Sequence, residues 1–173
     1  MKSFALLSLL CIQIVTTQAQ NTAAAQKTSA RNPYYSRTEK SVLKVSDAEW
    51  KKVLAPELYA VAREQQTERA FTGKYWNSDA KGAYYCAVCG NALFKSTAKF
   101  ASTCGWPSFF QALGKSSVTY KGDNSLGMER TEVLCHRCGS HLGHIFDDGP
   151  PPTHKRFCMN SIALDFEPDG PKS

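Results

Sequence analysis

Four cysteines form two C-x-x-C pairs, Cys86 with Cys89 and Cys135 with Cys138, and 45 residues separate the pairs. Each pair is followed by a glycine, which permits a tight turn that brings backbone amides close to the sulfurs. Four thiolates at this spacing can close a tetrahedral zinc site that leaves no position open for a substrate. The pattern therefore predicts a structural zinc ion that joins two turns of a small domain and adds to its folding free energy.

Three other interpretations of these cysteines stay open. An exported chain meets an oxidising compartment, where two disulfides are an alternative. One pair could be a redox pair of the thioredoxin type, although neither pair opens a βαβ unit. A zinc site made of Cys135, Cys138, His141 and His144 leaves the first pair without a role. Zinc bound by all four paired cysteines is favoured, and zinc alone would be typical of a ribbon that binds nucleic acid or a partner protein.

Cys158 stands outside these pairs, in the stretch RFCMNS, with Arg156 two residues before it and Asn160 two residues after it. A lone cysteine most often behaves as a small hydrophobic residue. Two further stretches favour chemistry instead: STCGWPSFF contains Cys104 and Trp106, and HLGHIFDDG contains two histidines three residues apart. The coincidence of all three stretches is harder to explain by independent core residues.

The motifs, in this order and spacing, resemble those of the B-type methionine sulfoxide reductases, which act on the R epimer of methionine sulfoxide. The resemblance runs from about Val42 to Phe166 through TERAFTGKYW, YYCAVCGNALFKSTAKF, CGWPSF and CHRCGSHLGHIFDDGPPPTHKRFCMNSIAL. It implies a mainly β fold of two antiparallel sheets with short N-terminal helices. It also implies one structural zinc bound by the four paired cysteines.

The resemblance implies that Cys158 is the nucleophile that attacks the sulfoxide sulfur. Attack requires a thiolate, so we expect a lowered pKa for Cys158, with Arg156 on the same side of the strand favouring the charged form. The sulfoxide oxygen must gain protons, and His141 and His144 are the candidate acids. Asp148 matches a position that the family uses to orient the arginine.

Three further residues complete the implied site. Asn160 is expected to orient water or imidazole by hydrogen bonding, and Trp106 to supply a flat apolar wall for the methyl group of the substrate. The attack leaves Cys158 as a sulfenic acid, and Cys104 matches the resolving cysteine that condenses with it to a disulfide. A thioredoxin-like dithiol would then reduce the disulfide by exchange, and oxidised proteins would be the substrates.

The length of 173 residues suits one domain with a core, and the net charge of +6 comes from basic residues that are scattered along the chain. This scatter is typical of a solvated surface, and no nucleic-acid partner is expected. Beside the reductase hypothesis, two others stay open: a zinc-ribbon binding module, and a redox sensor without turnover.

Residues 1–19 have the order of a secretory signal peptide, with Lys2 first, an apolar stretch over 4–15, and small residues near the end. The apolar stretch is shorter than the roughly 18 residues that indicate a membrane span. We therefore expect a secreted or periplasmic protein with no stable membrane insertion after cleavage. Lipid attachment at Cys11 is a lesser alternative.

The rest of the chain divides into three parts. Residues 20–40 are polar and without periodicity, which predicts a linker or disordered arm. Residues 41–168 are expected to form the reductase domain, and residues 169–173 a tail.

The elements that must position the reactive groups are predicted to be mainly strands. Ser46 and Glu49 form a capping box that begins one short helix, and Pro56 begins a second. Later in the chain, short aromatic and β-branched stretches separated by turn residues predict strands. RFCMNSIALDF is expected to be a single strand whose alternation puts Cys158 and Asn160 on the same side.

Overall fold

The computed structural model describes residues 32–170, so the predicted signal peptide at 1–19 and the last residues of the tail lie outside the described residues. The compact unit of the domain begins at Tyr34. Its helices and strands are α2 (Asp47–Val53), α3 (Pro56–Ala62), β1 (Gly82–Cys86), β2 (Ala92–Lys95), β3 (Lys99–Phe100), β4 (Ser108–Phe109), β5 (Val118–Asp123), β6 (Arg130–Cys135), β7 (His141–Phe146), β8 (Arg156–Met159) and β9 (Leu164–Pro168). Short 3-10 helices η1 (Ser96–Ala98), η2 (Ser125–Gly127) and η3 (Ser161–Ala163) join some of them. Between residues 32 and 170, no helix is both long and apolar enough to cross a membrane.

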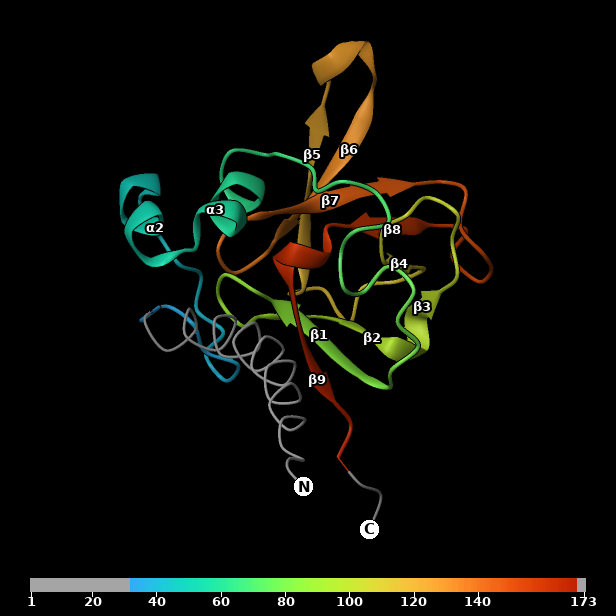
Figure 1. The fold of residues 1–173 in the computed structure, drawn as a ribbon, viewed down its shortest axis with the longest axis horizontal. Coiled ribbons are helices and arrows are strands. Elements are labelled where there is room, and N and C mark those ends of the chain that lie inside the picture. The colour runs from blue at the N-terminus through green and yellow to red at the C-terminus, as the bar shows by residue number, and fades with distance from the viewer. Residues whose placement is uncertain (1–31, 171–173) are drawn as a thin grey trace, which may run out of the picture. The chain divides into compact units, whose positions relative to one another are not determined.

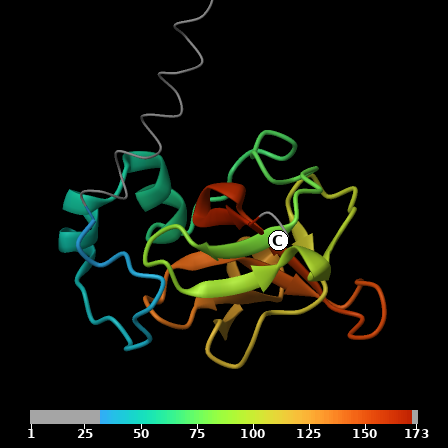
Figure 2. The same ribbon diagram turned by 90° about the horizontal axis from the view of Figure 1, so that it is seen from below.

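The strands form two antiparallel sheets, which confirms the predicted mainly β architecture. The smaller sheet has the order β2-β1-β9, and the larger sheet has the order β3-β4-β8-β7-β6-β5. Figure 1 shows the β5–β6 hairpin extending away from the other strands, and Figure 2 shows the green strands of the smaller sheet lying over the orange strands of the larger one. The strand that carries Cys158, β8, lies inside the larger sheet between β4 and β7.

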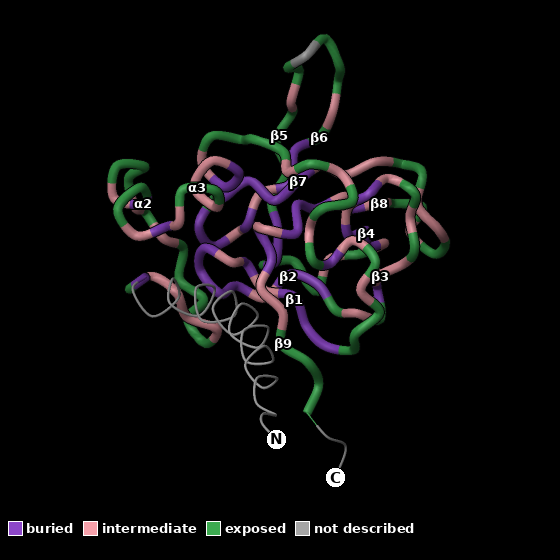
Figure 3. The backbone as a smooth tube through the Cα atoms, viewed as in Figure 1, coloured by how far each residue is buried: buried purple, intermediate pink, exposed green. Residues whose placement is uncertain are grey.

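Aromatic side chains pack between the two sheets. Phe94 of β2 stacks on Phe109 of β4 with ring centroids 4.4 Å apart, and Tyr84 of β1 meets the same ring edge-on at 5.0 Å. Phe157 of β8 contacts Phe94 at 5.6 Å, and each of these four residues is at most 4% exposed. Buried segments run through both sheets, whereas the tip of the β5–β6 hairpin is exposed (Figure 3). This core fixes the position of β8 from its buried side.

The predicted single strand RFCMNSIALDF is wrong, because the chain turns at Asn160. The segment forms β8, η3 and β9, and so it passes from the larger sheet to the smaller one. The carboxylate of Glu68 accepts hydrogen bonds from the N–H groups of Ser161 and Ile162, which satisfies the start of the helical turn. A distant side chain therefore stabilises the break, and the alternation of the segment does not reveal it.

Both N-terminal helices form where the sequence predicts them. Ser46 caps α2 by accepting a hydrogen bond from the N–H group of Glu49, and Pro56 is the first residue of α3. Each helix buries one face against the domain, through Trp50 in α2 and Val61 in α3.

Residues 34–37, which the sequence assigns to the linker, lie against the domain. Tyr35 and Arg37 both contact the carboxylate of Asp165 in β9, and Arg37 Nη2 lies 2.8 Å from Asp165 Oδ2. The N–H group of Ser36 donates to the carbonyl oxygen of Cys89 at 3.0 Å. These contacts make the segment part of the compact unit.

Candidate active site and metal centre

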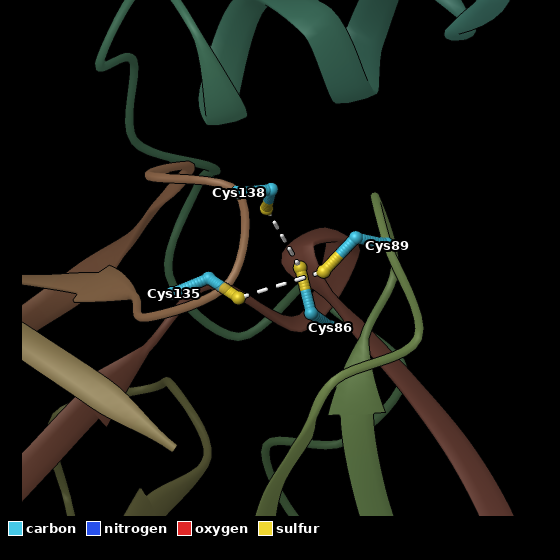
Figure 4. Close-up of side chains that lie close together, drawn as sticks. All are labelled: Cys86, Cys89, Cys135 and Cys138. Carbon is cyan, nitrogen blue, oxygen red and sulfur yellow. Dashed lines mark hydrogen bonds between the residues drawn. The ribbon is translucent and has the colours of Figure 1, made fainter. Parts of the chain in front are cut away.

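The four paired cysteines meet at one point, as Figure 4 shows. All four are buried, and their sulfurs lie within 4.8 Å of one another. Cys86 Sγ is 3.7 Å from Cys138 Sγ, and Cys89 Sγ is 3.6 Å from Cys135 Sγ. Each close contact thus joins one C-x-x-C turn to the other.

The two turns have the same local structure because a glycine follows each pair. Gly90, with a φ of 78°, donates its N–H to the carbonyl oxygen of Cys86 at 2.8 Å. Gly139, with a φ of 68°, makes the equivalent bond to Cys135 at 2.8 Å. A Cβ atom on Gly90 would lie 2.7 Å from the carbonyl oxygen of Ser36, so this glycine also lets the segment 34–37 approach.

The sulfur arrangement fits a tetrahedral metal ion. Zinc–sulfur bonds of about 2.3 Å give a tetrahedron with edges of about 3.8 Å, close to the two shortest sulfur–sulfur distances in the cluster. A disulfide would need about 2.05 Å, and the six cysteines within residues 32–170 are all free thiols. His141 and His144 contact carboxylates instead of joining the cluster, which speaks against the alternative ligand set. The four cysteines can therefore bind a metal ion.

A buried arginine in the second turn, Arg137, adds a charge to this site for which the sequence offers no signal. Arg137 is 3% exposed and donates hydrogen bonds to backbone carbonyl groups of Tyr34, Ser36, Ser41 and Cys89. Four thiolates and one divalent cation carry a net charge of −2, so a buried guanidinium beside them is electrostatically favourable. Arg137 also ties the first turn and the start of the domain to the second turn.

Cys104 and Cys158 face each other at a second sulfur site. Their Sγ atoms lie 3.5 Å apart, and both residues are partly exposed. Cys158 of β8 pairs with Ser108 of β4 on one side and with His144 of β7 on the other. A Cβ atom on Gly143 would lie 2.1 Å from the carbonyl oxygen of Cys158, so a glycine at this position allows β7 and β8 to approach. A small movement would bring the two sulfurs to disulfide distance.

The environment of this thiol pair favours Cys104 as the carrier of a negative charge. Burial disfavours the Cys104 thiolate, but hydrogen bonds with Ser102 and Ser108 outweigh it and lower the pKa of Cys104 to about 7. Burial raises the pKa of Cys158 to about 12, and Cys104 adds to the rise while Arg156 opposes it. The expected lowered pKa of Cys158 is therefore wrong for the substrate-free pair, because the arginine does not offset burial and the neighbouring sulfur.

Arg156 lies on the same side of β8 as Cys158, as the alternation predicts. Its Nε and Nη2 donate to the two carboxylate oxygens of Asp148 at 2.7 and 2.8 Å, and its guanidinium lies 4.4 Å over the ring of Phe146. The hydrogen bond from Arg156 holds the pKa of Asp148 below its usual value. Asp148 and Phe146 together fix the orientation of the guanidinium.

His141 and His144 lie side by side, with ring centroids 5.4 Å apart. A register shift in the pairing of β6 with β7 lets residues three apart face the same way. Nδ1 of His141 is 2.7 Å from the carboxylate of Glu132, and Nε2 of His144 is 2.8 Å from the carboxylate of Asp123. Burial lowers the pKa of His141, and its Nε2 has no hydrogen-bond partner among the described residues.

Asn160 and Trp106 both bind the backbone of Glu68. Asn160 accepts a hydrogen bond from the Glu68 N–H at 3.0 Å and donates to the carbonyl oxygen of Leu142 at 3.1 Å. The indole Nε1 of Trp106 donates to the carbonyl oxygen of Glu68 at 3.1 Å. The Asn160 amide is thus engaged by backbone groups on both sides, and it positions the segment that holds Trp106.

Several polar residues of the site have weak or no signals in the sequence. They are Glu68, Ser108, Asp123 and Glu132. Ser108 lies within STCGWPSFF and Glu132 lies in the strand stretch TEVLC, so motif position and alternation could have suggested these two. Glu68 lies within TERAFTGKYW, so its motif position could also have suggested it, although its residue type alone is that of an ordinary surface residue.

Comparisons with known proteins cover most of the domain. The SelR domain family matches residues 54–168. The chain is 57% identical over 123 residues to the peptide methionine sulfoxide reductase MsrB of Thiobacillus denitrificans, an alignment that covers 71% of this chain and 93% of the relative. It is 53% identical over 122 residues to the protein of the same name from Methanosarcina barkeri, covering 70% and 86%. For the Acinetobacter baylyi protein of that name, the identity is 46% over 127 residues, covering 73% and 91%.

Proposed function

The chain belongs to the SelR-domain family of B-type peptide methionine sulfoxide reductases, and from this premise we propose how its own residues carry out the reduction. The proposed reaction is thiol-dependent reduction of methionine-R-sulfoxide in proteins, through a Cys158 sulfenic acid and a Cys158–Cys104 disulfide. The observation that carries this proposal is the 3.5 Å contact between the two sulfurs, with His144 paired directly opposite the nucleophile.

Cys158 is the nucleophile in the first step. Its thiolate attacks the sulfoxide sulfur, the S–O bond of the substrate breaks, and the oxygen ends on Cys158, so that methionine and a sulfenic acid are the products. The substrate sulfur gains two electrons and Cys158 loses two. The Cys158 proton must leave before attack, and the Cys104 thiolate in contact with it can accept this proton. Because the pKa is about 12 for Cys158 and about 7 for Cys104, only a small fraction of the pair carries the charge on Cys158 before it attacks. Arg156, held by Asp148, then stabilises the Cys158 thiolate.

Two histidines act on the sulfoxide oxygen. His144 donates a proton to it, and Asp123 orients the imidazole for this role. His141 is kept neutral by burial, and its unpartnered Nε2 accepts a hydrogen bond from water or from the protonated oxygen. Glu132 fixes the His141 ring from the other nitrogen.

Trp106 supplies the flat apolar wall that receives the methyl group of the substrate. The indole is fixed by its hydrogen bond to Glu68, which Asn160 holds in turn. In the R epimer the methyl group meets the wall while the oxygen turns toward the histidines. In the S epimer these two groups are exchanged, so the oxygen would lose its hydrogen bonds.

The second step regenerates the enzyme. Cys104 Sγ attacks the sulfur of the Cys158 sulfenic acid, a sulfur–sulfur bond forms, and the hydroxyl group leaves as water. A thioredoxin-like dithiol then reduces the disulfide by exchange. Oxidised proteins are the substrates of the first step, and the dithiol partner is the substrate of the last.

The metal proposed for the four paired cysteines is zinc, with one ion per chain. Thiolates at tetrahedral spacing suit this ion, and all four positions would be filled by protein ligands. When bound, the ion supplies a crosslink between the β1–β2 turn and the β6–β7 turn. Catalysis is left to Cys158, Cys104 and the two histidines.

Export is proposed from the signal-like residues 1–19, with periplasm or secretion as the destination. Cell fractionation with N-terminal sequencing of the mature protein tests it. Recovery from the periplasm or medium with a new N-terminus near residue 20 is expected. A cytoplasmic protein that retains residues 1–19 would refute it.

Turnover of separate R and S epimers of a blocked methionine sulfoxide with dithiothreitol tests the proposed function. We expect the wild type to reduce the R epimer alone and Cys158→Ser to lose at least 1,000-fold, which is roughly 4 kcal/mol of transition-state stabilisation. Thermal melting of both proteins controls for folding. If the zinc-loaded protein turns over neither epimer, the enzyme proposal fails and the binding module or redox sensor takes its place.

A further inference from the structure

A cavity of about 280 Å³ lies beside the loop that carries Cys104. Its wall includes Trp76, Lys99 and Ser102. The Oγ atom of Ser102 accepts a hydrogen bond from the Cys104 N–H at 3.3 Å, so the cavity borders the proposed resolving cysteine. None of the steps proposed above uses this cavity.

The distance from the cavity to the nucleophile suits a short stretch of peptide. Phe100, which also lines the cavity, pairs with Ser108, and Ser108 pairs with Cys158. Adjacent strands are about 4.8 Å apart, so Phe100 and Cys158 are separated by roughly 10 Å across the sheet. Lys99, the neighbour of Phe100 in the edge strand β3, pairs with Phe109 and so lines the cavity from the other face of that strand. An extended chain advances about 3.3 Å per residue, so a side chain roughly three residues from the bound sulfoxide would reach the cavity.

An exposed aromatic edge lies between the cavity and Cys158. Phe71 is 54% exposed and has a φ of 65°, which is rare for a large side chain. Its N–H group donates to the carbonyl oxygen of Gly105 at 2.8 Å, and its ring meets Trp76 edge-on at 5.3 Å. Because Gly105 follows Cys104 and Trp76 lines the cavity, Phe71 and Trp76 form a continuous apolar edge for a passing peptide.

The cavity contains a cation that its surroundings only partly satisfy. Lys99 is partly buried, and its Nζ donates to the carbonyl oxygen of Trp76 at 3.4 Å, although an ammonium group has three donors. Within residues 32–170, no carboxylate forms an ion pair with it. Burial lowers the pKa of Lys99, and the charge of Asp79, which also lines the cavity, opposes this without forming an ion pair. Lys81 on the same wall adds a second cation, so lysines outnumber carboxylates in the lining, and Ala101 adds no charge.

We propose that this cavity binds an acidic side chain of the substrate protein, about three residues from the methionine sulfoxide, with Lys99 as its cationic partner. The proposal rests on the proposed function and adds a preference for the sequence around the oxidised methionine. The incoming carboxylate completes the hydrogen bonds of the ammonium group, and the edge of Phe71 and Trp76 supports the chain between the two subsites.

The test uses short peptides with one methionine-R-sulfoxide and either Asp or Lys at each position from two to four residues away on both sides. For the wild type we expect the kcat/KM ratio of the Asp peptide to the Lys peptide to reach about tenfold at one position. Lys99→Met should reduce the ratio to within twofold of one, and Lys99→Arg should keep most of it. Ala101→Asp, which adds a second carboxylate to the cavity beside that of Asp79, should also remove the preference.

Lys95→Met is the matched control, because Lys95 is exposed on β2 and does not line the cavity. It removes the same charge and should keep the wild-type ratio, which separates a local site from the general effect of net charge. A ratio near one at every position in the wild type, or a ratio that Lys99→Met leaves unchanged, overturns the proposal. Turnover of a blocked methionine-R-sulfoxide, which has no flanking residues, shows separately whether the proposed function holds.

Discussion

Two sulfur sites in this domain have almost the same spacing and very different surroundings. The closest sulfur pairs lie 3.6 and 3.7 Å apart in the four-cysteine cluster and 3.5 Å apart at Cys104 and Cys158. The cluster is buried, and glycine turns set the backbone around it. The second pair is partly exposed, and serine side chains and an arginine surround it.

The comparison indicates that sulfur distance alone does not distinguish the proposed metal site from the proposed redox site. Burial raises the pKa of the Cys86 thiol, and hydrogen bonds from the neighbouring thiols lower the pKa of Cys138, so a buried cluster needs a cation to hold more than one negative charge. At the second site, hydrogen bonds with Ser102 and Ser108 overcome burial and allow one thiolate without a metal. The number of sulfurs, their burial and the source of their hydrogen bonds decide the chemistry.

Replacing one sulfur of the buried cluster by oxygen should have the largest effect of the changes considered, on both metal content and thermal stability. In Cys135→Ser we expect the bound zinc to fall from one equivalent to near zero. Tm should decrease by roughly 10 °C or more, which is a loss of roughly 3–5 kcal/mol at about 2–4 °C per kcal/mol. Metal analysis and calorimetry measure both quantities. Cys104→Ser is the matched control and should keep its zinc and most of its Tm; equal losses in the two variants would remove the distinction between the sites.

Replacing sulfur by oxygen at the second site should lower the activity with one type of reductant much more than with the other. For Cys104→Ser we expect turnover driven by a thioredoxin to fall at least 100-fold, because the dithiol partner meets no disulfide. Turnover with dithiothreitol should fall by less than tenfold, because a small thiol reaches the Cys158 sulfenic acid directly. Steady-state rates with both reductants give the answer. Equal losses with the two reductants would limit Cys104 to accepting the Cys158 proton in the first step and would exclude it as the resolving cysteine.

The smallest effect concerns the pH at which the second site becomes reactive. Alkylation of Cys104 should rise through a midpoint near pH 7, because its pKa is about 7 and only the thiolate reacts. Ser108→Ala removes a hydrogen bond to the thiolate and should move the midpoint upward by about half a pH unit, or about 0.7 kcal/mol. Mass spectrometry identifies the labelled cysteine at each pH. Ser116→Ala, on an exposed loop, should leave the midpoint unchanged, and a downward shift in Ser108→Ala would contradict the assignment.

The parts of the molecule that sequence predicts well depend on short-range spacing. The two C-x-x-C turns, the cap at Ser46 and the helix start at Pro56 all follow from residues within one turn of each other. The meeting of Cys104 with Cys158 comes from the family resemblance, since β4 and β8 are far apart along the chain.

The parts that sequence does not predict depend on distant contacts. The break at Asn160 is stabilised by Glu68, about ninety residues earlier, and alternation within one segment contains no trace of that partner. The pKa of Cys158 depends on burial and on the sulfur of Cys104, so the arginine two residues away does not predict the direction of the pKa shift. The role of Arg137 requires the segment 34–41 to fold over the metal site.

The position of β8 in the larger sheet has a consequence for synthesis on the ribosome. β8 is inserted between β4 and β7, and β9 then pairs with β1, so the last strands of the chain complete both sheets. Such long-range pairing forms slowly and only after the partners exist. Cys158 therefore joins Cys104 and the two histidines only after β8 has been translated, and a nascent chain that stops before residue 156 contains the proposed metal ligands without the proposed nucleophile.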